Sequence, residues 1–306
     1  MAESFSKYFG EPFADSSAIP TWMVSKLARE SVTVALSGDG GDELFAGYSW
    51  LHTNLQAARY RKIPSGIRSM IGGGLSMASQ TPFIRKLGRF HGDAGLSPME
   101  SFRRREQCFD QAFLDDLFLP HVVKGIDQEW TGRYLKHVEA SEGMADENRM
   151  LYQDTVMYLP DDILTKVDRM SMGNSLEARV PLLDHRMVEF AATVPFHLKY
   201  SRGISKRLVK HAMAGFLPES TLQQRKRGFA IPVHRWFRED PNDYFQDVVL
   251  RHDSNCRDYL DMCEVKRLVD VNQGGMENYG HHLWVLLMFE HWLTYASKLP
   301  NILISL

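Results

Sequence analysis

The sequence predicts an α/β fold in which a small parallel sheet precedes a largely helical C-terminal region. Residues 32–36 form a short, mostly apolar run rich in β-branched side chains, which predicts a buried strand. Three glycines follow within residues 38–41, and residues 43–46 then have helix-forming side chains. Beyond residue 50, apolar positions recur mostly at helical spacing.

The composition of the 306 residues is that of an ordinary globular protein. A formal net charge of −2 and a hydrophobic content of 44% exclude disordered, collagen-like and generally polyanion-binding classes. The most apolar run, residues 283–293, is interrupted by Glu290 and His291 and is too short to span a membrane. Residues 1–4 lead into polar sequence, so we expect no signal peptide and a cytoplasmic location.

The three cysteines argue for a structural role rather than for catalysis. Cys108, Cys256 and Cys263 are odd in number and lack the spacing of metal ligands. No sequence signature of a thiol nucleophile surrounds any of them. This usage fits a reducing cytoplasm.

The N-terminal residues predict only part of a parallel α/β unit. Residues 9–17 are rich in turn formers, and residues 19–29 carry apolar side chains at helical spacing. The strand at residues 32–36 needs at least one parallel neighbour, and no segment before it supplies one. We therefore expect the chain to begin in the middle of a larger fold.

Residues 56–105 are unusually basic. Residues 71–74, which include three glycines, and the Thr-Pro pair at 81–82 predict breaks between short helical pieces. Interleaved phenylalanines would suit nucleic-acid contact, but no recognition motif accompanies them. Since the rest of the chain is acidic, we prefer a solvated surface to a nucleic-acid interface.

Helix signals recur in the middle of the chain. Residues 97–100 form a capping box with proline at the first helical position. Residues 151–159 predict a helix that Pro160 ends. Residues 163–170 predict the next helix, with Lys166 away from its apolar face.

The later residues return briefly to extended structure. Residues 177–184 are predicted to be extended, and Asp184 can cap the helix that follows. Within this segment we expect Glu177 and Arg179 to form a structural ion pair between the helical region and the sheet. The tail from residue 244 onward is predicted to be helical, with an apolar core.

The glycine-rich loop at residues 37–48 is the strongest local signal for chemistry. A strand, a glycine-rich turn and a helix start gather backbone N–H groups into an anion cradle. Asp39 and Asp42 inside such a cradle make sense if a divalent cation bridges them to phosphate oxygens, or if one contacts a reacting group. The structural alternative is a tight turn with Asp39 as a turn residue and Asp42 as a helix N-cap.

Five blocks in order resemble the asparagine synthetase family, specifically the synthetase domain of the glutamine-dependent enzyme. The blocks are residues 11–17, 37–48, 158–172, 176–184 and 225–232. The resemblance implies an ATP-pyrophosphatase (adenine nucleotide alpha hydrolase-like) fold. It also implies that a carboxylate, aspartate in the namesake enzyme, attacks the α-phosphorus of ATP, and that ammonia from glutamine then displaces AMP.

The resemblance assigns roles to four residues of the glycine-rich loop. Ser37 and Gly38 match positions that contact ATP. Asp39 matches an acid that supports formation of the intermediate and of the amide. Asp42 matches a ligand of Mg²⁺ on the pyrophosphate side, where a hard cation would neutralise developing charge.

Three catalytic candidates lie outside that loop. Lys226 matches a lysine that stabilises charge on the α-phosphate, and Lys206 matches a second lysine on the pyrophosphate. A lysine suits this role because it is a mobile point charge. Asp161, or its neighbour Asp162, matches a position near the centre of amide formation.

Two expected parts of the family pattern are missing from the sequence. The first ATP-binding signature, Ser-Gly-Gly-x-Asp-Ser, does not occur, and Ala2 stands where a glutaminase has its nucleophilic cysteine. We interpret residues 1–306 as an N-terminally truncated synthetase domain, with residues 1–55 as the rest of the nucleotide-binding sheet and residues 56–306 as the mainly helical region. Alone, it should not hydrolyse glutamine and should bind ATP weakly or not at all.

Alternatives remain for the substrate, the partners and the function. The carboxylate could be aspartate or a sugar acid, and a longer chain or a partner chain would supply the missing half. A homodimer is compatible with the resemblance. Competing functions are a tRNA-modifying ATP-pyrophosphatase relative and a catalytically silent interaction module.

Overall fold

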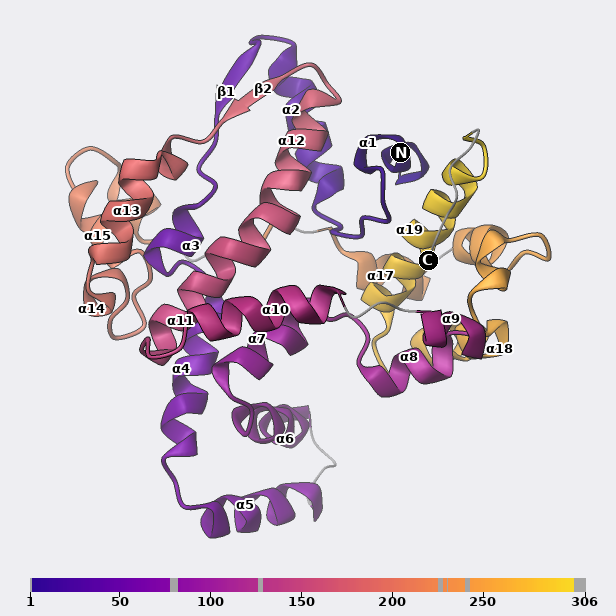
Figure 1. Cartoon of the computed structure of the whole chain (residues 1–306), viewed down its shortest axis with the longest axis horizontal. Coiled ribbons are helices and arrows are strands. Elements are labelled where there is room, and N and C mark those ends of the chain that lie inside the picture. The colour runs from indigo at the N-terminus through magenta and orange to yellow at the C-terminus, as the bar shows by residue number, and fades with distance from the viewer. Residues whose placement is uncertain are drawn as a thin grey trace.

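Helices dominate the part of the chain that the structure describes, and the sheet found there has two parallel strands (Figure 1). The computed structural model describes residues 2–77, 82–125, 129–224, 228–229, 231–239 and 243–299. Its elements, with 3₁₀- and π-helices labelled η, are η1 Ala2–Phe5, α1 Ser6–Phe9, α2 Ala18–Arg29, β1 Val34–Leu36, α3 Gly41–Phe45, α4 Ser49–Arg61, α5 Ser65–Met77, α6 Pro82–Ala94, α7 Pro98–Glu106, α8 Gln111–Leu117, α9 Pro120–Gly125, α10 Glu129–Ala140, α11 Asp146–Gln153, η2 Asp154–Leu164, α12 Thr165–Met172, β2 Glu177–Arg179, η3 Pro181–Leu183, α13 His185–Thr193, α14 Phe196–Lys199, α15 Arg207–Ala212, α16 Glu219–Leu222, α17 Val233–Glu239, η4 Gln246–Leu250, η5 Asn255–Asp258, α18 Met262–Gln273 and α19 Gly280–Ala296.

Strand β1 pairs in parallel with β2, which the chain reaches only after α12. Val34 lies opposite Glu177, and Leu36 lies opposite Arg179. Extended structure is confirmed at residues 34–36 and 177–179, but the prediction that it continues to residue 184 is wrong, because Pro181–Leu183 form the 3₁₀-helix η3. The predicted burial of β1 is also wrong. Its side chains Val34 and Leu36 are exposed because the described helices cover little of the sheet.

The predicted ion pair on β2 forms but does not connect two parts of the fold. Arg179 Nε lies 2.7 Å from Glu177 Oε1, and both side chains are exposed on the same strand. The pair therefore does not hold the helical region to the sheet. Asp184 does cap α13 as predicted, since its Oδ1 accepts the Arg186 N–H at 3.0 Å.

Helices α2 and α12 lie side by side beneath the two strands (Figure 1). The start of α2 is fixed by Asp15, whose Oδ1 accepts the Ser17 N–H at 2.9 Å. Further along α2, Asn174 Nδ2 donates to the backbone oxygen of Trp22 at 3.3 Å and also to that of Met170 in α12 at 2.9 Å. These contacts confirm the predicted helix at residues 19–29 and fasten it to α12.

The helix predicted to end at Pro160 instead continues through it. Helix α11, the π-helix η2 and α12 form one uninterrupted helical rod, and Pro160 lies inside η2 (Figure 1). A proline cannot donate to the fourth residue before it, but the wider π-turn tolerates that loss. Two threonine hydroxyls also donate to backbone oxygens of this rod: Thr155 to Leu151 O and Thr165 to Pro160 O, each at 2.8 Å.

Helices α4 to α7 make up much of the basic region. The three glycines at residues 72–74 do not break α5, contrary to the prediction, because glycine weakens a helix without forbidding it. A Cβ on Gly72 would crowd the His91 ring of α6, so the missing side chain allows the two helices to approach. The capping box is confirmed: Ser97 Oγ accepts the Glu100 N–H, and Glu100 Oε2 accepts the Ser97 N–H.

The largest apolar core lies at the C-terminal end and includes α1, as α19 packs against η1, α1, α17 and α18. Leu283 and Trp284 of α19 are buried, and Trp284 Nε1 donates to Ala14 O at 2.8 Å. The predicted helical tail with an apolar core is confirmed. Even so apolar a helix as α19 is not suited to cross a bilayer, and the same holds for every other helix in the described ranges.

The cysteines are free thiols in the structure. Burial raises the pKa of Cys108 to about 11 and also raises the pKa of the buried Cys256. Both thiols therefore stay protonated near neutral pH, which is unfavourable for a nucleophile.

Candidate functional site

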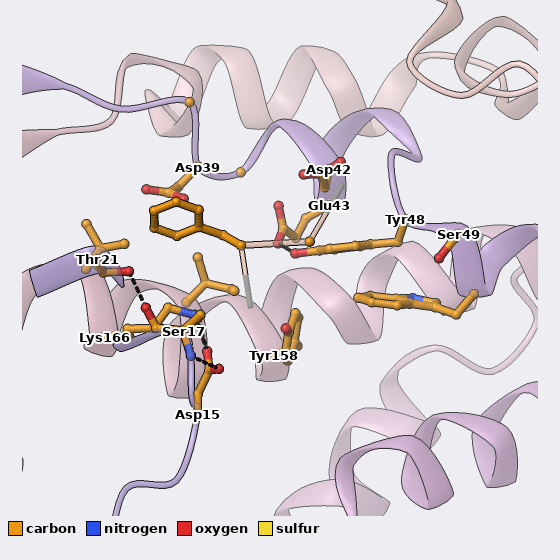
Figure 2. A pocket seen from close by; sticks show the side chains of 17 residues that line it. Asp15, Ser17, Thr21, Asp39, Asp42, Glu43, Tyr48, Ser49, Tyr158 and Lys166 are labelled. Atoms are coloured by element: carbon orange, nitrogen blue, oxygen red, sulfur yellow. Dashed lines mark hydrogen bonds and ion pairs between the residues drawn. The ribbon is translucent and has the colours of Figure 1, made fainter. Parts of the chain in front are cut away.

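A cavity of about 400 Å³ opens between the glycine-rich loop and the helices α2, η2 and α12 (Figure 2). The loop contributes Asp39 and Asp42 to one side of it, and Asp15 and Lys166 lie on the opposite side. Its volume lies in the range of small-molecule sites. The cavity thus joins the loop singled out from the sequence to residues far from it in the chain.

The loop turns sharply at Gly40, which has a positive φ of 80°. A Cβ at this position would overlap the Leu183 side chain, so only glycine suits both the conformation and the space. Gly40 is also the N-cap of α3, and Asp42 lies inside the first turn. The alternative that Asp42 is an N-cap is therefore wrong.

Ser37 and Asp39 are joined within the loop. The Ser37 hydroxyl donates to Asp39 Oδ2, and the Ser37 N–H donates to Arg179 O of β2 at 2.8 Å. Gly38 and Asp39 line the cavity. The structure thus places Gly38 and Asp39 at the cavity, with Ser37 oriented by β2 just before them.

Asp42 is paired with Lys206, which lies far along the sequence. Lys206 Nζ is 2.9 Å from Asp42 Oδ1, and the Lys206 N–H donates to Phe45 O at 3.2 Å. Lys206 has a positive φ of 51°, an uncommon conformation for a residue with a side chain. Gly47 leaves room for the pair, because a Cβ there would overlap Asp42 and crowd Lys206.

Two further catalytic candidates are placed differently. Asp161 is exposed and accepts a hydrogen bond from Arg133 Nη2 at 2.7 Å, and it is not among the residues that line the cavity. Lys226 lies outside the described residues, although the nearby Gly228 and Phe229 line the cavity. The roles assigned to Asp161 and Lys226 stay predictions.

Asp162, named from the sequence as the alternative to Asp161, belongs to a buried group of charges with Asp15 and Lys166. The sequence did not predict this grouping. The Lys166 ammonium contacts Asp15 and lies 4.0 Å from Asp162 Oδ1. Burial and the nearby Asp15 raise the pKa of Asp162 to about 7. Burial alone would raise the pKa of Asp15, but Lys166 holds that pKa below its ordinary value.

We expect Asp162→Asn to change how stability depends on pH. Between about pH 4 and pH 7 the folded chain keeps a proton on Asp162 that the unfolded chain has lost, so stability falls as pH rises. Asparagine does not titrate, so the free energy of unfolding of the variant should not fall in this way. By about pH 8 it should exceed that of the parent by roughly 2–4 kcal/mol. Urea unfolding from about pH 4 to pH 8 measures it, with the exposed Asp168→Asn on the same rod as control. If the free energy of unfolding changed with pH in the same way in parent and variant, the raised pKa of Asp162 would be refuted.

An aromatic wall closes one end of the cavity and was also missed from the sequence. Tyr48 stacks on Trp50 with ring centres 3.7 Å apart, and Tyr158 meets both rings edge-on. The Tyr48 hydroxyl donates to the buried Glu43, and burial raises the pKa of both groups (Figure 2). The only local sequence feature that could have predicted this wall is the pair of aromatic residues within 48–50.

Asp42 fits a magnesium ion that is shared with phosphates. Mg²⁺ usually keeps several waters and takes one or two carboxylates plus substrate phosphate oxygens. Within the described ranges, no three histidine, cysteine, aspartate or glutamate side chains are arranged to hold a metal ion. Asp42 would then supply one carboxylate oxygen to an ion that phosphate oxygens also hold.

Comparison with known proteins decides the family. The sequence model of the asparagine synthase family matches residues 2–294. The chain belongs to this family. Most of the described fold, including the cavity and the two strands, lies within the matched residues.

Individual relatives agree with this assignment. The chain is similar to asparagine synthetase (glutamine-hydrolyzing) 1 of Bacillus subtilis, with 31% identity over 287 residues, which cover 93% of this chain and 44% of the relative. A putative asparagine synthetase (glutamine-hydrolyzing) of Mycobacterium bovis is 28% identical over 293 residues, with 93% and 43% covered. The chain thus spans less than half the length of these asparagine synthetase relatives.

Proposed function

We propose that this chain forms part of an ATP-dependent ligase that amidates a carboxylate, as members of the asparagine synthase family are named for doing. The observation that carries the proposal is the meeting of Asp42 and Lys206 beside the glycine-rich loop. These two residues are the expected cation ligand and the expected pyrophosphate lysine. Folding brings them together even though 163 residues separate them along the chain.

The proposed reaction has two balanced steps. A carboxylate oxygen attacks the α-phosphorus of ATP, the bond to the bridging oxygen of the β-phosphate breaks, and pyrophosphate leaves. Ammonia then attacks the acyl carbon, the bond from that carbon to the phosphate oxygen breaks, and AMP leaves with an oxygen atom from the carboxylate. The amide nitrogen releases its proton to a nearby base.

The residues of the cavity suit these steps. Gly38 and the N–H groups of the turn would contact the nucleotide, and Asp39 would support formation of the intermediate and of the amide. Lys206, together with Lys226, would stabilise charge on the departing pyrophosphate. When bound, Mg²⁺ would neutralise phosphate charge at Asp42.

The exposed apolar side chains of β1 support the proposal that further strands adjoin this sheet. Leu36 is 75% exposed, and Met23 and Leu27 of α2 also present apolar side chains to solvent. An exposed apolar surface of this kind typically marks a site where other protein structure packs. We propose that additional strands of an ATP-pyrophosphatase sheet, from a longer chain or a partner chain, cover it. Glutamine-derived ammonia, and a substrate such as aspartate or a related acid, would come with that arrangement.

Asp42→Asn tests the proposal. The enzyme is purified from its own cells through a tag on this chain, so that any further part of the assembly is retained. Pyrophosphate release with aspartate, ATP, Mg²⁺ and ammonia should require aspartate and should fall by roughly 100-fold or more in the variant, because the cation loses its carboxylate ligand. Asp168→Asn is the matched control. Release that needs no carboxylate, or that survives Asp42→Asn, would argue against the proposal.

A further inference from the structure

Arg105 connects the basic helical region to the aromatic wall of the cavity. It is the penultimate residue of α7, and its side chain is mostly buried. The guanidinium carbon lies 4.1 Å from the centre of the Trp50 ring, on which it stacks. Arg105 Nη2 donates to Asp154 Oδ1 at 2.5 Å, and Nε donates to Glu106 Oε1 at 2.8 Å.

Trp50 is held from two directions by this arrangement. The guanidinium of Arg105 lies over its ring, the ring of Tyr48 stacks on it, and its Nε1 donates to Asp154 Oδ2 at 3.2 Å. The same Asp154 carboxylate therefore receives Arg105 on one oxygen and Trp50 on the other. Since Asp154 is only 2% exposed, little solvent is present to weaken these interactions.

The chain of contacts extends to the glycine-rich loop. Tyr48 stacks on Trp50 and donates its hydroxyl to Glu43 of α3. Tyr48, Trp50 and Glu43 all line the cavity, whereas Arg105 does not. A displacement of Arg105 would thus reach the cavity through Trp50 without any direct contact between Arg105 and a bound molecule.

We propose that Arg105 is a positioning residue that fixes Trp50, and through it Tyr48, so that α7 sets the shape of the cavity and the acids it accepts. The kinetic consequence rests on the proposed function, but the placement of Trp50 does not. Arginine suits the task because its planar guanidinium can stack and donate in fixed directions at once. Lysine would keep the charge beside Asp154 but could not reproduce the stack.

Fluorine NMR of 5-fluorotryptophan-labelled chain tests the placement directly. Trp50→Phe assigns the Trp50 resonance, and Arg105→Met should shift or broaden that resonance while those of Trp22 and Trp284 stay in place. Arg103→Met, an exposed arginine on the same helix, is the matched control and should leave Trp50 unchanged. If Arg105→Met does not fold, Arg105→Lys decides, because a shift confined to Trp50 is expected there too.

Kinetics then tests the effect on the cavity. In the enzyme purified through this chain, Arg105→Met should lower kcat/KM for the carboxylate roughly 10- to 100-fold, mainly through KM, and Arg105→Lys should recover part of it. An unmoved Trp50 resonance in a folded Arg105 variant, or an unchanged KM beside a moved resonance, would overturn the proposal. Absence of pyrophosphate release in the parent enzyme would instead count against the proposed function, and the NMR result would stand.

Discussion

Lys206→Met is expected to lower pyrophosphate release by roughly 10²–10³-fold and to tighten Mg²⁺ binding at Asp42. In the proposed function the rate falls because a positive charge is removed from the place where pyrophosphate charge would develop. Cation binding tightens because Lys206 Nζ, 2.9 Å from Asp42 Oδ1, no longer competes for that carboxylate. An ion pair of this partly exposed kind is worth at most about 1 kcal/mol, so Mg²⁺ affinity should rise by no more than about fivefold.

Two measurements separate these opposite effects. Pyrophosphate release follows the rate, and the rise in melting temperature with added Mg²⁺ follows cation binding without any need for turnover. Lys210→Met is the control, since it removes the same charge one turn along α15, where no ion pair to Asp42 is found among the described contacts. Equal Mg²⁺ responses in the parent chain and Lys206→Met would rule out competition for Asp42.

Glu290→Ala should strongly destabilise the C-terminal core. The Glu290 side chain of α19 is fully buried and accepts hydrogen bonds from the backbone N–H groups of Asn255 and Cys256 and from the Ser254 hydroxyl. Burial alone would raise its pKa, but hydrogen bonds from Cys256 and Asn255 hold the pKa of Glu290 below its ordinary value. Alanine would leave the donors buried without acceptors, at a cost of about 3–5 kcal/mol.

Chemical denaturation measures this loss as a lower unfolding midpoint with an unchanged slope. Glu239→Ala provides the contrast, because Glu239 is an exposed residue whose Oε2 lies 2.8 Å from Arg235 Nε. That surface pair should contribute less than about 1 kcal/mol. Similar losses in the two variants would mean that the Glu290 hydrogen bonds have no special weight.

Local sequence signals predicted individual elements well. The strand before Ser37, the capping box at Ser97 and the capping of α13 by Asp184 each depend on a few adjacent residues, and the structure has all three. The prediction that a helix ends at Pro160 was wrong because proline normally ends an α-helix, whereas a π-helix accommodates it here. The exposure of β1 depends on what covers the sheet, and no local pattern contains that information.

The site was only partly predictable for the same reason. Asp39 and Asp42 could be picked out from the sequence because a glycine-rich turn between a strand and a helix is a known anion-binding arrangement. Lys206 could be assigned only through family resemblance, since spacing says nothing of a contact across the fold. Lys166 and Arg105 were missed because long-range burial, rather than any motif, brings each to the cavity or its wall.

The central claim is that the carboxylate is activated on the α-phosphorus of ATP, and oxygen-18 transfer tests it most directly. The enzyme purified through this chain is supplied with aspartate labelled with oxygen-18 in its side-chain carboxylate, together with ATP, Mg²⁺ and ammonia. Mass spectrometry of the AMP should find one labelled oxygen for each amide formed. Amide formation with unlabelled AMP would contradict the account, because the acyl carbon would then have been activated by another route.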